Sequence, residues 1–511
     1  MRKTGALAAL GSLLEKADSF IWGPWMLMLM LGTGIFLMIR MHFLPLRRLL
    51  FALRCACCAY DADGGQCAGE DRERCTNIEN NTGKENGLDR ECSIGKKNGI
   101  CKDGGSASKE KSEGITPFSS LMTELAATIG TGNIVGVASA MVLGGPGALF
   151  WMVVSSFIGM STKFAESMLA VKYRVRNEAG EFCGGPMYTM VNGLKWKRLG
   201  KCLGYLYAFL AFFASLGMGN MTQTNSVAAA LKDSFQIPVL VTGLLTGALI
   251  LFAVEGGIRK IAKITQILVP AMSIAYLLGA LMVILLHPQN LLSGLARILC
   301  LAWNPKAATG GFLGQLVGNR ALRYGISRGV FSNEAGLGAA GISAAATDTA
   351  DPVRQGYISM TGVFFDTVVI CSVTGLAIAA SGMLGARNST GELLTGAELT
   401  IAAFSTVFGE LGGAVVSVGI TLFALATAIA WAYQGEKAFE FLTRGRISNY
   451  WYRSLYGLAA FLGAVCSLEE VWNLAELING LMAVPNLLCV LLLSGEAAQG
   501  ILEFEAERRG S

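Results

Sequence analysis

The chain has 511 residues, of which 53% are hydrophobic and 15% are charged, and its formal net charge is +5. Soluble domains are typically about 25% charged, so this composition excludes a soluble multidomain protein and predicts an all-α polytopic membrane protein. The weak net charge gives no reason to expect nucleic acid as a partner.

Eleven segments are long and apolar enough to cross a bilayer as helices, which takes about 20 residues. In chain order they are residues 20–40, 118–143, 147–172, 203–230, 237–254, 266–287, 317–346, 356–381, 408–433, 450–467 and 471–493. This pattern divides the chain into a first helix with a basic end (1–54), a polar insert (55–115), a ten-helix core (116–495) and a tail (496–511).

The polar insert holds 12 acidic and 9 basic residues between positions 61 and 113. Its Gly, Asn, Lys and Glu content predicts a flexible appendage without a core of its own. The run from Cys55 to Cys58 is interpreted as reduced thiols, with a zinc half-site or acylation as alternatives. Asn80 begins a glycosylation sequence, and its use would invert the orientation derived next.

Basic loop residues predict the orientation, because Lys and Arg are retained on the cytoplasmic side. The basic residues after the first span lie on the same side of the membrane as those of every second later loop, and this side is taken as cytoplasmic. Arg320 and Arg323 are exceptions, because they lie in an outside segment. We therefore expect a multi-pass protein of the plasma membrane with its N-terminus outside and its C-terminus in the cytoplasm.

Two predicted spans carry glycines and polar residues in their middle. The second span contains Gly130, Gly132 and Gly136, and the seventh places Ser332-Asn333-Glu334 directly before Gly336 and Gly338. Each glycine costs a helix up to about 1 kcal/mol relative to alanine, so both spans are predicted to unwind there. Close helix packing through small residues is the alternative for either segment alone.

The interrupted spans are the first and sixth of the ten that follow the insert. Five spans per half is an odd number, so the two halves run through the bilayer in opposite orientations. Paired interruptions in inverted halves predict a binding site near the midplane, because unpaired backbone groups are tolerated there only beside a ligand or cavity.

Several long motifs occur around these breaks in a fixed order. They are ATIGTGNIVGVASAMVLGGPGALFWM, GMSTKFAESMLAVKYR, CGGPMY, GMGNMTQTNSVA, RGVFSNEAGLG, DPVRQG and AWAYQGEK. Over about residues 117–442 the chain closely resembles the alanine or glycine:cation symporter family, the sodium:alanine symporters. The resemblance implies a leucine-transporter-like fold of five plus five inverted helices with one extra N-terminal helix. It also implies sodium-coupled uptake of alanine, glycine or a similar small neutral amino acid.

A zwitterionic amino acid must have both of its charges paired when it leaves water. The amides of Thr131 and Gly132 are expected to bind the carboxylate beside the positive end of the following half-helix. The ammonium is expected to face the second break, at the carbonyls of Phe331 and Ser332 or the side chains of Asn333 or Glu334.

Two further contacts with the amino acid are implied by the resemblance. Gln223 would contact the ligand as a neutral hydrogen-bonding group, although it could serve only to join helices. Trp431 would close the pocket and exclude bulky side chains, although it could instead lie in an interfacial belt.

Sodium prefers several oxygen ligands. The carbonyls of Ala126 and Ile129 are expected to meet Ala424 and Thr427 of the ninth span, a pairing that the resemblance supports. The Thr427 hydroxyl could instead bond to its own helix.

Acidic residues inside the spans leave the coupling ion open. Glu124, Glu334 and Asp366 are the deepest acids, and Glu334 is the strongest candidate for a gating or structural ion pair. Glu166 lies one turn from Lys163 and is expected to pair with it. A proton bound to one of the three deep acids would make this a proton-coupled symporter. A passive channel is a further alternative.

An enzyme is not expected. The only matching motif, Gly325-Ile-Ser-Arg-Gly329, lies at the mouth of a predicted helix with no candidate histidine near it. The two histidines, His42 and His287, lie at the margins of apolar runs, so neither a histidine metal centre nor a cofactor is predicted.

Overall fold

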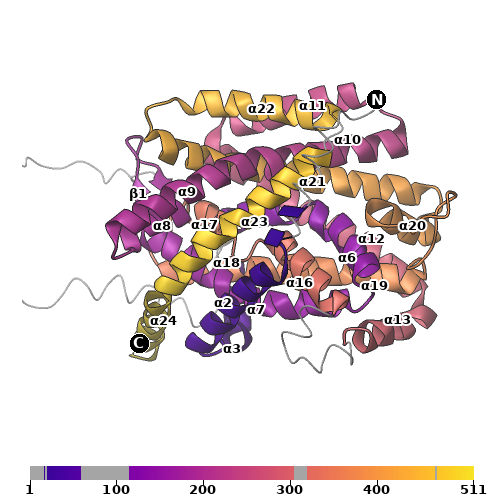
Figure 1. Cartoon of the computed structure of the whole chain (residues 1–511), viewed down its shortest axis with the longest axis horizontal. Helices are drawn as coiled ribbons and strands as arrows, with labels where there is room; N and C mark the ends of the chain where they lie inside the picture. The colour runs from indigo at the N-terminus through magenta and orange to yellow at the C-terminus, as the bar shows by residue number, and fades with distance from the viewer. Residues whose placement is uncertain (1–15, 18–19, 59–113, 304–318, 467–468, 511) are drawn as a thin grey trace, which may run out of the picture.

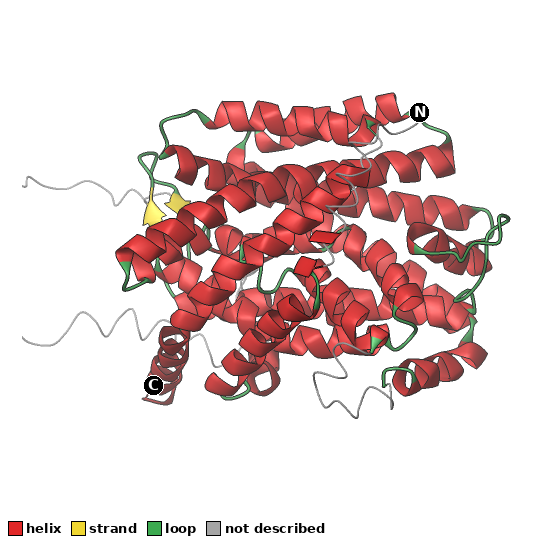
Figure 2. Ribbon diagram, in the orientation of Figure 1, coloured by secondary structure: helices red, strands yellow, loops and turns green. Residues whose placement is uncertain are grey.

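The computed structural model describes residues 16–17, 20–58, 114–303, 319–466 and 469–510. These residues form a bundle of helices, with one short two-stranded hairpin at its edge (Figures 1 and 2). Most of the predicted insert 55–115, including Asn80, lies outside the described residues.

The first half of the described chain contains the first broken span and the hairpin. Its elements are α2 (Pro24–Arg40), α3 (Leu44–Cys58), α5 (Pro117–Thr128), a 3-10 turn (Thr131–Asn133), α6 (Val135–Leu143), α7 (Ala148–Lys172), β1 (Val175–Arg176), β2 (Phe182–Cys183), α8 (Pro186–Gly193), α9 (Lys197–Leu216), a π-helical turn (Gly217–Met221), α10 (Thr222–Phe235), α11 (Val239–Val254), α12 (Gly257–Leu286) and α13 (Pro288–Cys300).

The second half contains the second broken span. Its elements are α16 (Arg320–Asn333), α17 (Ala339–Ala344), α18 (Pro352–Val363), a π-helical segment (Phe364–Cys371), α19 (Ser372–Ser381), α20 (Gly396–Phe408), α21 (Leu411–Thr443), α22 (Asn449–Val465), α23 (Glu469–Leu492) and α24 (Ser494–Gly510).

Six helices are long and apolar enough to cross a membrane: Ala148–Lys172, Lys197–Phe235, Gly257–Leu286, Pro352–Ser381, Leu411–Thr443 and Asn473–Leu492. A seventh is formed if α2 and α3, bent by 79° at their junction, are counted as one span. The chain is therefore an all-helical, multi-pass membrane protein. The count of eleven spans and the inverted repeat stay predictions.

Apolar side chains cover the outward faces of several helices. On α11 and α12, Leu244, Leu245, Phe252, Ile267 and Leu285 are all more than half exposed. Such a surface would be unfavourable in water, but it is the expected surface of a helix that contacts lipid.

Two long helices hold the two broken spans. α7 packs against α16, α17, α18 and α2, and α21 packs against α5, α9, α10, α12 and α20. The break between α5 and α6 and the break between α16 and α17 are formed largely by buried residues and lie inside the bundle.

Two predicted segments are shorter than the helices that contain them. The segment 408–433 overlaps α21, which begins at Leu411 and continues to Thr443 because the charged residues after Trp431 find partners inside the protein. The segment 203–230 belongs to a continuous helix, Lys197–Phe235, that contains the π-helical turn.

The predicted C-terminal tail, 496–511, lies almost wholly in the helix α24. α24 contacts α7, where Lys172 Nζ lies 2.7 Å from Glu496 Oε2. Glu496 also accepts a hydrogen bond from the Tyr173 hydroxyl. Burial alone would raise the pKa of the Glu496 carboxyl. The contacts with Lys172 and Tyr173 outweigh that effect and hold the pKa below its usual value.

Candidate functional site

The helix predicted to break near Gly130 does so. α5 ends at Thr128, Ile129 leaves the helical conformation, Gly130 is extended, and the chain resumes in the 3-10 turn before α6. The Gly130 amide donates to Asn133 Oδ1 over 2.9 Å. A side chain of the turn therefore pairs a backbone group that the lost helical bonds would leave free.

The second predicted break lies between α16 and α17. Glu334 ends α16 with a φ of 56°, and Gly336 and Gly338 have φ values of 100° and 79°. These left-handed conformations suit glycine, which explains two of the glycines in this motif. The freed carbonyls have partners: Gly336 accepts from Asn486 (2.9 Å) and Leu337 from the Tyr207 hydroxyl (3.0 Å).

The glycines of the first break distinguish an unwound helix from simple helix packing. A Cβ placed on Gly136 would meet no atom within 4 Å, so this glycine makes no close helix contact. A Cβ on Gly132 would lie 3.4 Å from the Cα of Ser332, on the other broken span. The two breaks therefore lie against each other, and the packing alternative is wrong for Gly136.

Asp366 joins the two breaks. Its Oδ1 accepts from Asn133 Nδ2 over 2.7 Å, and its Oδ2 accepts from the hydroxyls of Ser332 (3.0 Å) and Thr367 (2.8 Å). From the sequence, Asp366 was predicted only as one of three acids deep in the spans, and Glu334 was the stronger candidate. The sequence feature that marked Asp366 was its position in the apolar run FFDTVVIC.

Thr427 faces the first break. Its hydroxyl lies 3.0 Å from the carbonyl oxygen of Ala126 and 3.4 Å from that of Ile129, and also 3.0 Å from the carbonyl of Phe423 in its own helix. The Thr427 hydroxyl thus lies close to the two carbonyls of the first break, as predicted, and also to a carbonyl of its own helix, which was the alternative. Ala424 lies one turn earlier on the continuous helix α21 and is fully buried.

Gln223 lies on the other side of the first break. Its Oε1 accepts from the Thr131 hydroxyl over 3.4 Å, and its Nε2 donates to the carbonyl of Met218 in the π-helical turn. The bulge of that turn leaves a carbonyl free to fix the amide orientation. The side-chain oxygen is thereby directed toward the break.

Trp431 closes the same region from α21. Its Nε1 donates to Glu334 Oε1 over 3.0 Å, and its side chain is 1% exposed, which excludes a place in an interfacial belt. A Cβ on Gly219 would lie 2.5 Å from the indole, so this glycine is needed for the ring to fit. Among the described residues, the Glu334 side chain forms no ion pair within 4 Å in this structure, and its hydrogen-bonding partner is Trp431.

One further expectation differs from the structure. Lys163 does not pair with Glu166: Lys163 Nζ donates to the carbonyl of Asn333 (3.1 Å), and Glu166 accepts from Asn486 (2.5 Å). The adjacent broken span and α23 offer these partners, which a pattern confined to one helix does not reveal. The Phe331 ring packs toward Trp22, with ring centroids 6.4 Å apart, and its backbone carbonyl stays the predicted ligand.

The side chains at the breaks are enclosed. Those with less than 7% exposure are Thr131, Gln223, Ser332, Asn333, Thr427 and Trp431. These side chains are therefore shielded from solvent. The described residues also form a cavity that none of these six side chains lines.

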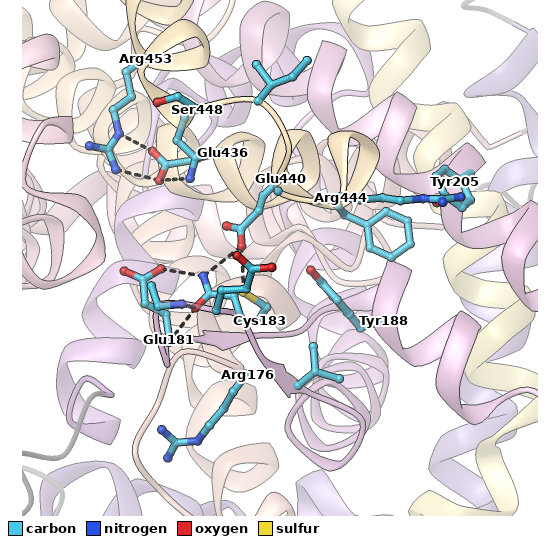
Figure 3. A pocket seen from close by; sticks show the side chains of 18 residues that line it. Arg176, Glu181, Cys183, Tyr188, Tyr205, Glu436, Glu440, Arg444, Ser448 and Arg453 are labelled. Carbon is cyan, nitrogen blue, oxygen red and sulfur yellow. Dashed lines mark hydrogen bonds and ion pairs between the residues drawn. The ribbon is translucent and has the colours of Figure 1, made fainter.

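That cavity, of about 620 Å³, lies where α21 ends (Figure 3). It is lined by residues of the β1–β2 hairpin, the end of α21 and the start of α22, among them Glu181, Cys183, Glu440 and Arg444. The Arg453 guanidinium binds both oxygens of Glu436 in its wall, over 2.7 and 2.8 Å.

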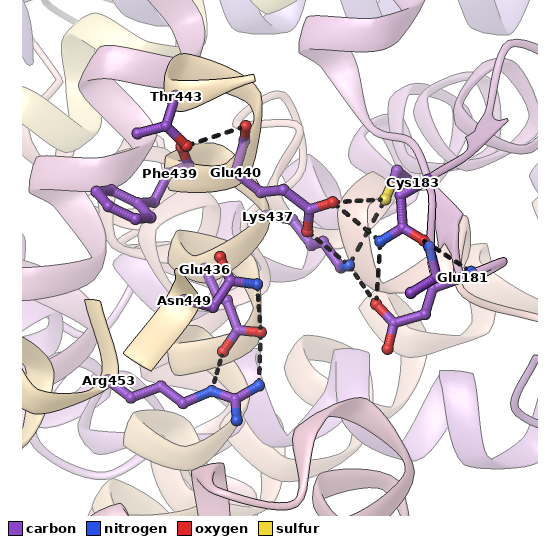
Figure 4. A network of polar contacts seen from close by, with 11 residues as sticks. Glu181, Cys183, Glu436, Lys437, Phe439, Glu440, Thr443, Asn449 and Arg453 are labelled. Carbon is purple, nitrogen blue, oxygen red and sulfur yellow. Dashed lines mark hydrogen bonds and ion pairs between the residues drawn. The ribbon is translucent and has the colours of Figure 1, made fainter. Parts of the chain in front are cut away.

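A buried lysine ties the hairpin to α21 beside this cavity. Lys437 Nζ lies 2.8 Å from Glu181 Oε2 and 2.9 Å from Glu440 Oε2 (Figure 4). The neighbouring Cys183 is buried as well, and burial raises the pKa of its thiol to about 11. We name Lys437, Glu181, Glu440 and Cys183 the hairpin lock.

Sequence comparisons identify relatives over nearly the whole chain. The family model described as the sodium:alanine symporter family matches residues 98–511. The sodium/alanine symporter AgcS of Methanococcus maripaludis is 42% identical over 499 residues, which cover 98% of each chain. A probable sodium/glutamine symporter, GlnT, of Bacillus subtilis is 36% identical over 409 residues, covering 79% of this chain and 81% of that protein.

A structural comparison gives a more distant similarity. A manganese transporter of Eremococcus coleocola, solved as a point mutant, matches with a TM-score of 0.44 and 16% sequence identity. The match covers 74% of this chain and 77% of that one.

Proposed function

The chain belongs to the sodium:alanine symporter family, and on this basis we propose that it carries a small neutral amino acid, alanine or glycine, into the cell together with sodium. The observation that carries the proposal is the position of the Thr427 hydroxyl, within hydrogen-bond distance of the Ala126 and Ile129 carbonyls at a break in α5–α6. Three oxygens from two helices converge there, as a hard cation requires.

The amino acid would bind between the two breaks. The amides of Thr131 and Gly132 precede the half-helix α6, whose N-terminal dipole favours a carboxylate. The ammonium would face the backbone carbonyls of Phe331 and Ser332, because the Asn333 carbonyl already accepts from the Lys163 ammonium. Ser332 lies in contact distance of Gly132, so the two charged groups of one small zwitterion could be held at the same place.

Trp431 and Gln223 would set the size and orientation of the substrate. Trp431 is fixed by its bond to Glu334 and by its close approach to Gly219, so it has little freedom to move aside for a large side chain. Gln223 would offer its amide to the ligand without adding charge. Methyl and hydrogen side chains fit such a site, and bulky ones would be excluded by overlap.

The hairpin lock would close the cytoplasmic side. In the predicted orientation the end of α21 faces the cytoplasm, and α21 carries both Thr427 and Lys437. Release of the substrate inward would then require the Lys437 contacts with Glu181 and Glu440 to separate, which opens the cavity at the end of α21 toward the breaks.

Uptake of radiolabelled alanine into proteoliposomes tests the function. An inward sodium gradient should drive accumulation, whereas a proton gradient or no gradient should give only equilibration. One relative is named as a putative sodium/proton-dependent alanine carrier, so uptake must also be measured with a proton gradient alone. Accumulation driven by protons alone would replace sodium with a proton, and uptake indifferent to every gradient would indicate a passive channel.

Substitutions locate the site within the same assay. Thr427→Ala should weaken the sodium dependence of uptake, and Trp431→Ala should weaken alanine uptake, both at unchanged amounts of protein in the membrane. Thr421→Ala is a matched control, because that hydroxyl donates only to the Ser417 carbonyl of its own helix. Normal transport by both site variants would refute the assignment. Unlabelled glutamine and glycine as competitors would rank the substrates.

A further inference from the structure

A second polar cluster is buried beside the candidate site. It centres on Glu124 of α5, whose Oε1 accepts hydrogen bonds from Ser359 (2.9 Å), Gln355 (3.4 Å) and Ser120 (3.4 Å). The Ser120 hydroxyl also lies 3.2 Å from the carbonyl of Ser343. The cluster therefore joins α5, α17 and α18, and so it touches one half of each broken span.

The unpaired atoms in and beside this cluster are all oxygen acceptors. Glu124 Oε2, Gln355 Oε1 and Gln434 Oε1 have no hydrogen-bonding partner among the residues that the structure describes, and each of these side chains is at most 2% exposed. Gln434 reaches the cluster through its Nε2, which donates to the Ser343 hydroxyl over 3.4 Å. Unpaired buried acceptors are costly, and a positively charged ligand is the kind of partner that could pair several of them.

The buried charges around Glu124 point the same way. Lys163 of α7 is buried as well, at 1% exposure. Its ammonium donates to the carbonyl of Asn333, so it is not committed to Glu124. A buried carboxylate needs a counter-charge or a bound cation, and among the described residues the hydrogen-bonding partners of the Glu124 side chain are two hydroxyls and one amide.

We propose that Glu124 forms a second sodium site, with oxygens of Ser120, Ser359 and Gln355 completing the coordination. The inference rests on the proposed function, in which sodium is the coupling ion. Carboxylate, hydroxyl and amide oxygens are the ligands of a hard cation. Glu124 would supply the one negative charge that balances a monovalent ion.

The position of this site would make it part of the coupling mechanism. Glu124 lies two residues before Ala126, whose carbonyl meets Thr427. A cation held there would fix α5 against α18 and, through Ser120 and Ser343, against α17. Binding would thus stabilise the arrangement in which the two breaks face each other, and loss of the ion would release it.

Equilibrium binding of radioactive sodium to the purified full-length protein, without amino acid, tests the proposal. Wild-type protein should bind about two sodium ions per chain, and Glu124→Gln and Ser359→Ala should each bind roughly half as much at saturation. Thr427→Ala should also lose one ion, whereas Glu124→Gln combined with Thr427→Ala should lose both. Glu166→Gln is the matched control, because that carboxyl is equally buried but accepts from an amide rather than hydroxyls.

Several results would overturn the proposal. Unchanged sodium binding by folded Glu124→Gln, judged by its elution as a monodisperse species and its unfolding temperature, would exclude the site. Proton release on sodium addition that disappears in Glu124→Gln, with a single ion bound by wild type, would assign Glu124 to a proton instead. A failure of the proposed function looks different: wild-type protein would then bind no sodium, or would bind it without alanine uptake.

Discussion

The substitution Gly130→Ala tests the geometry of the first break with a single methyl group. Gly130 has a φ of −133°, which alanine adopts without backbone strain. A Cβ at this position would nevertheless lie 2.7 Å from Thr427 Oγ1 and 3.6 Å from Gln223 Oε1. The substitution therefore acts on the two side chains of the candidate site rather than on the backbone.

The size of the effect follows from that overlap. A carbon and an oxygen in ordinary contact are about 3.4 Å apart or more, so the Thr427 hydroxyl must move by roughly 0.7 Å. It is buried and bonded to the Ala126 carbonyl at 3.0 Å, so a move of this size disrupts the oxygen cluster. Overpacking of this kind costs about 1–3 kcal/mol, which corresponds to a sodium affinity roughly 5- to 150-fold lower.

The assay is the sodium concentration dependence of alanine uptake in proteoliposomes. Gly136→Ala serves as the matched control, because it lies in the same broken span and its Cβ would meet no atom within 4 Å. It should leave sodium dependence unchanged and add up to about 1 kcal/mol of stability to α6. Wild-type sodium dependence in Gly130→Ala, or an equal loss in Gly136→Ala, would refute the reasoning.

Three further predictions concern the candidate site and the hairpin lock. Trp431→Ala should let leucine compete with alanine for uptake, which wild type should not allow; continued exclusion of leucine would contradict the role of the indole. Lys437→Met should cost about 3 kcal/mol, because it leaves Glu440 buried without its cation, and an unchanged unfolding temperature would contradict this. With its pKa raised to about 11, the Cys183 thiol should resist iodoacetamide at neutral pH and react faster as the pH rises toward that value, while exposed Cys202 is the accessible control thiol.

The sequence was most informative about local helix structure. Glycines at 130, 132, 336 and 338 predicted both breaks, because glycine clusters are costly in a helix and the left-handed conformations at 336 and 338 require them. The long apolar runs predicted the membrane class. The ends of helices were less predictable, since α21 extends through charged residues whose partners come from a hairpin distant in the sequence.

The partners within the site depended on packing that a sequence does not show. Thr427 was placed correctly opposite the Ala126 and Ile129 carbonyls with the help of the family resemblance. Asp366, by contrast, was known only as an acid in an apolar run, and its three hydrogen bonds come from both breaks and a neighbour. Spacing within one helix predicted that Lys163 pairs with Glu166, but Lys163 instead donates a hydrogen bond to the Asn333 carbonyl of another helix.

An experimental structure determined with alanine and sodium bound would test the account most directly. We predict alanine between the two breaks, with its carboxylate at the amides of Thr131 and Gly132, and a sodium ion coordinated by Ala126, Ile129 and Thr427. Alanine found in the cavity at the end of α21, or sodium absent from the Thr427 hydroxyl while alanine is bound, would contradict it.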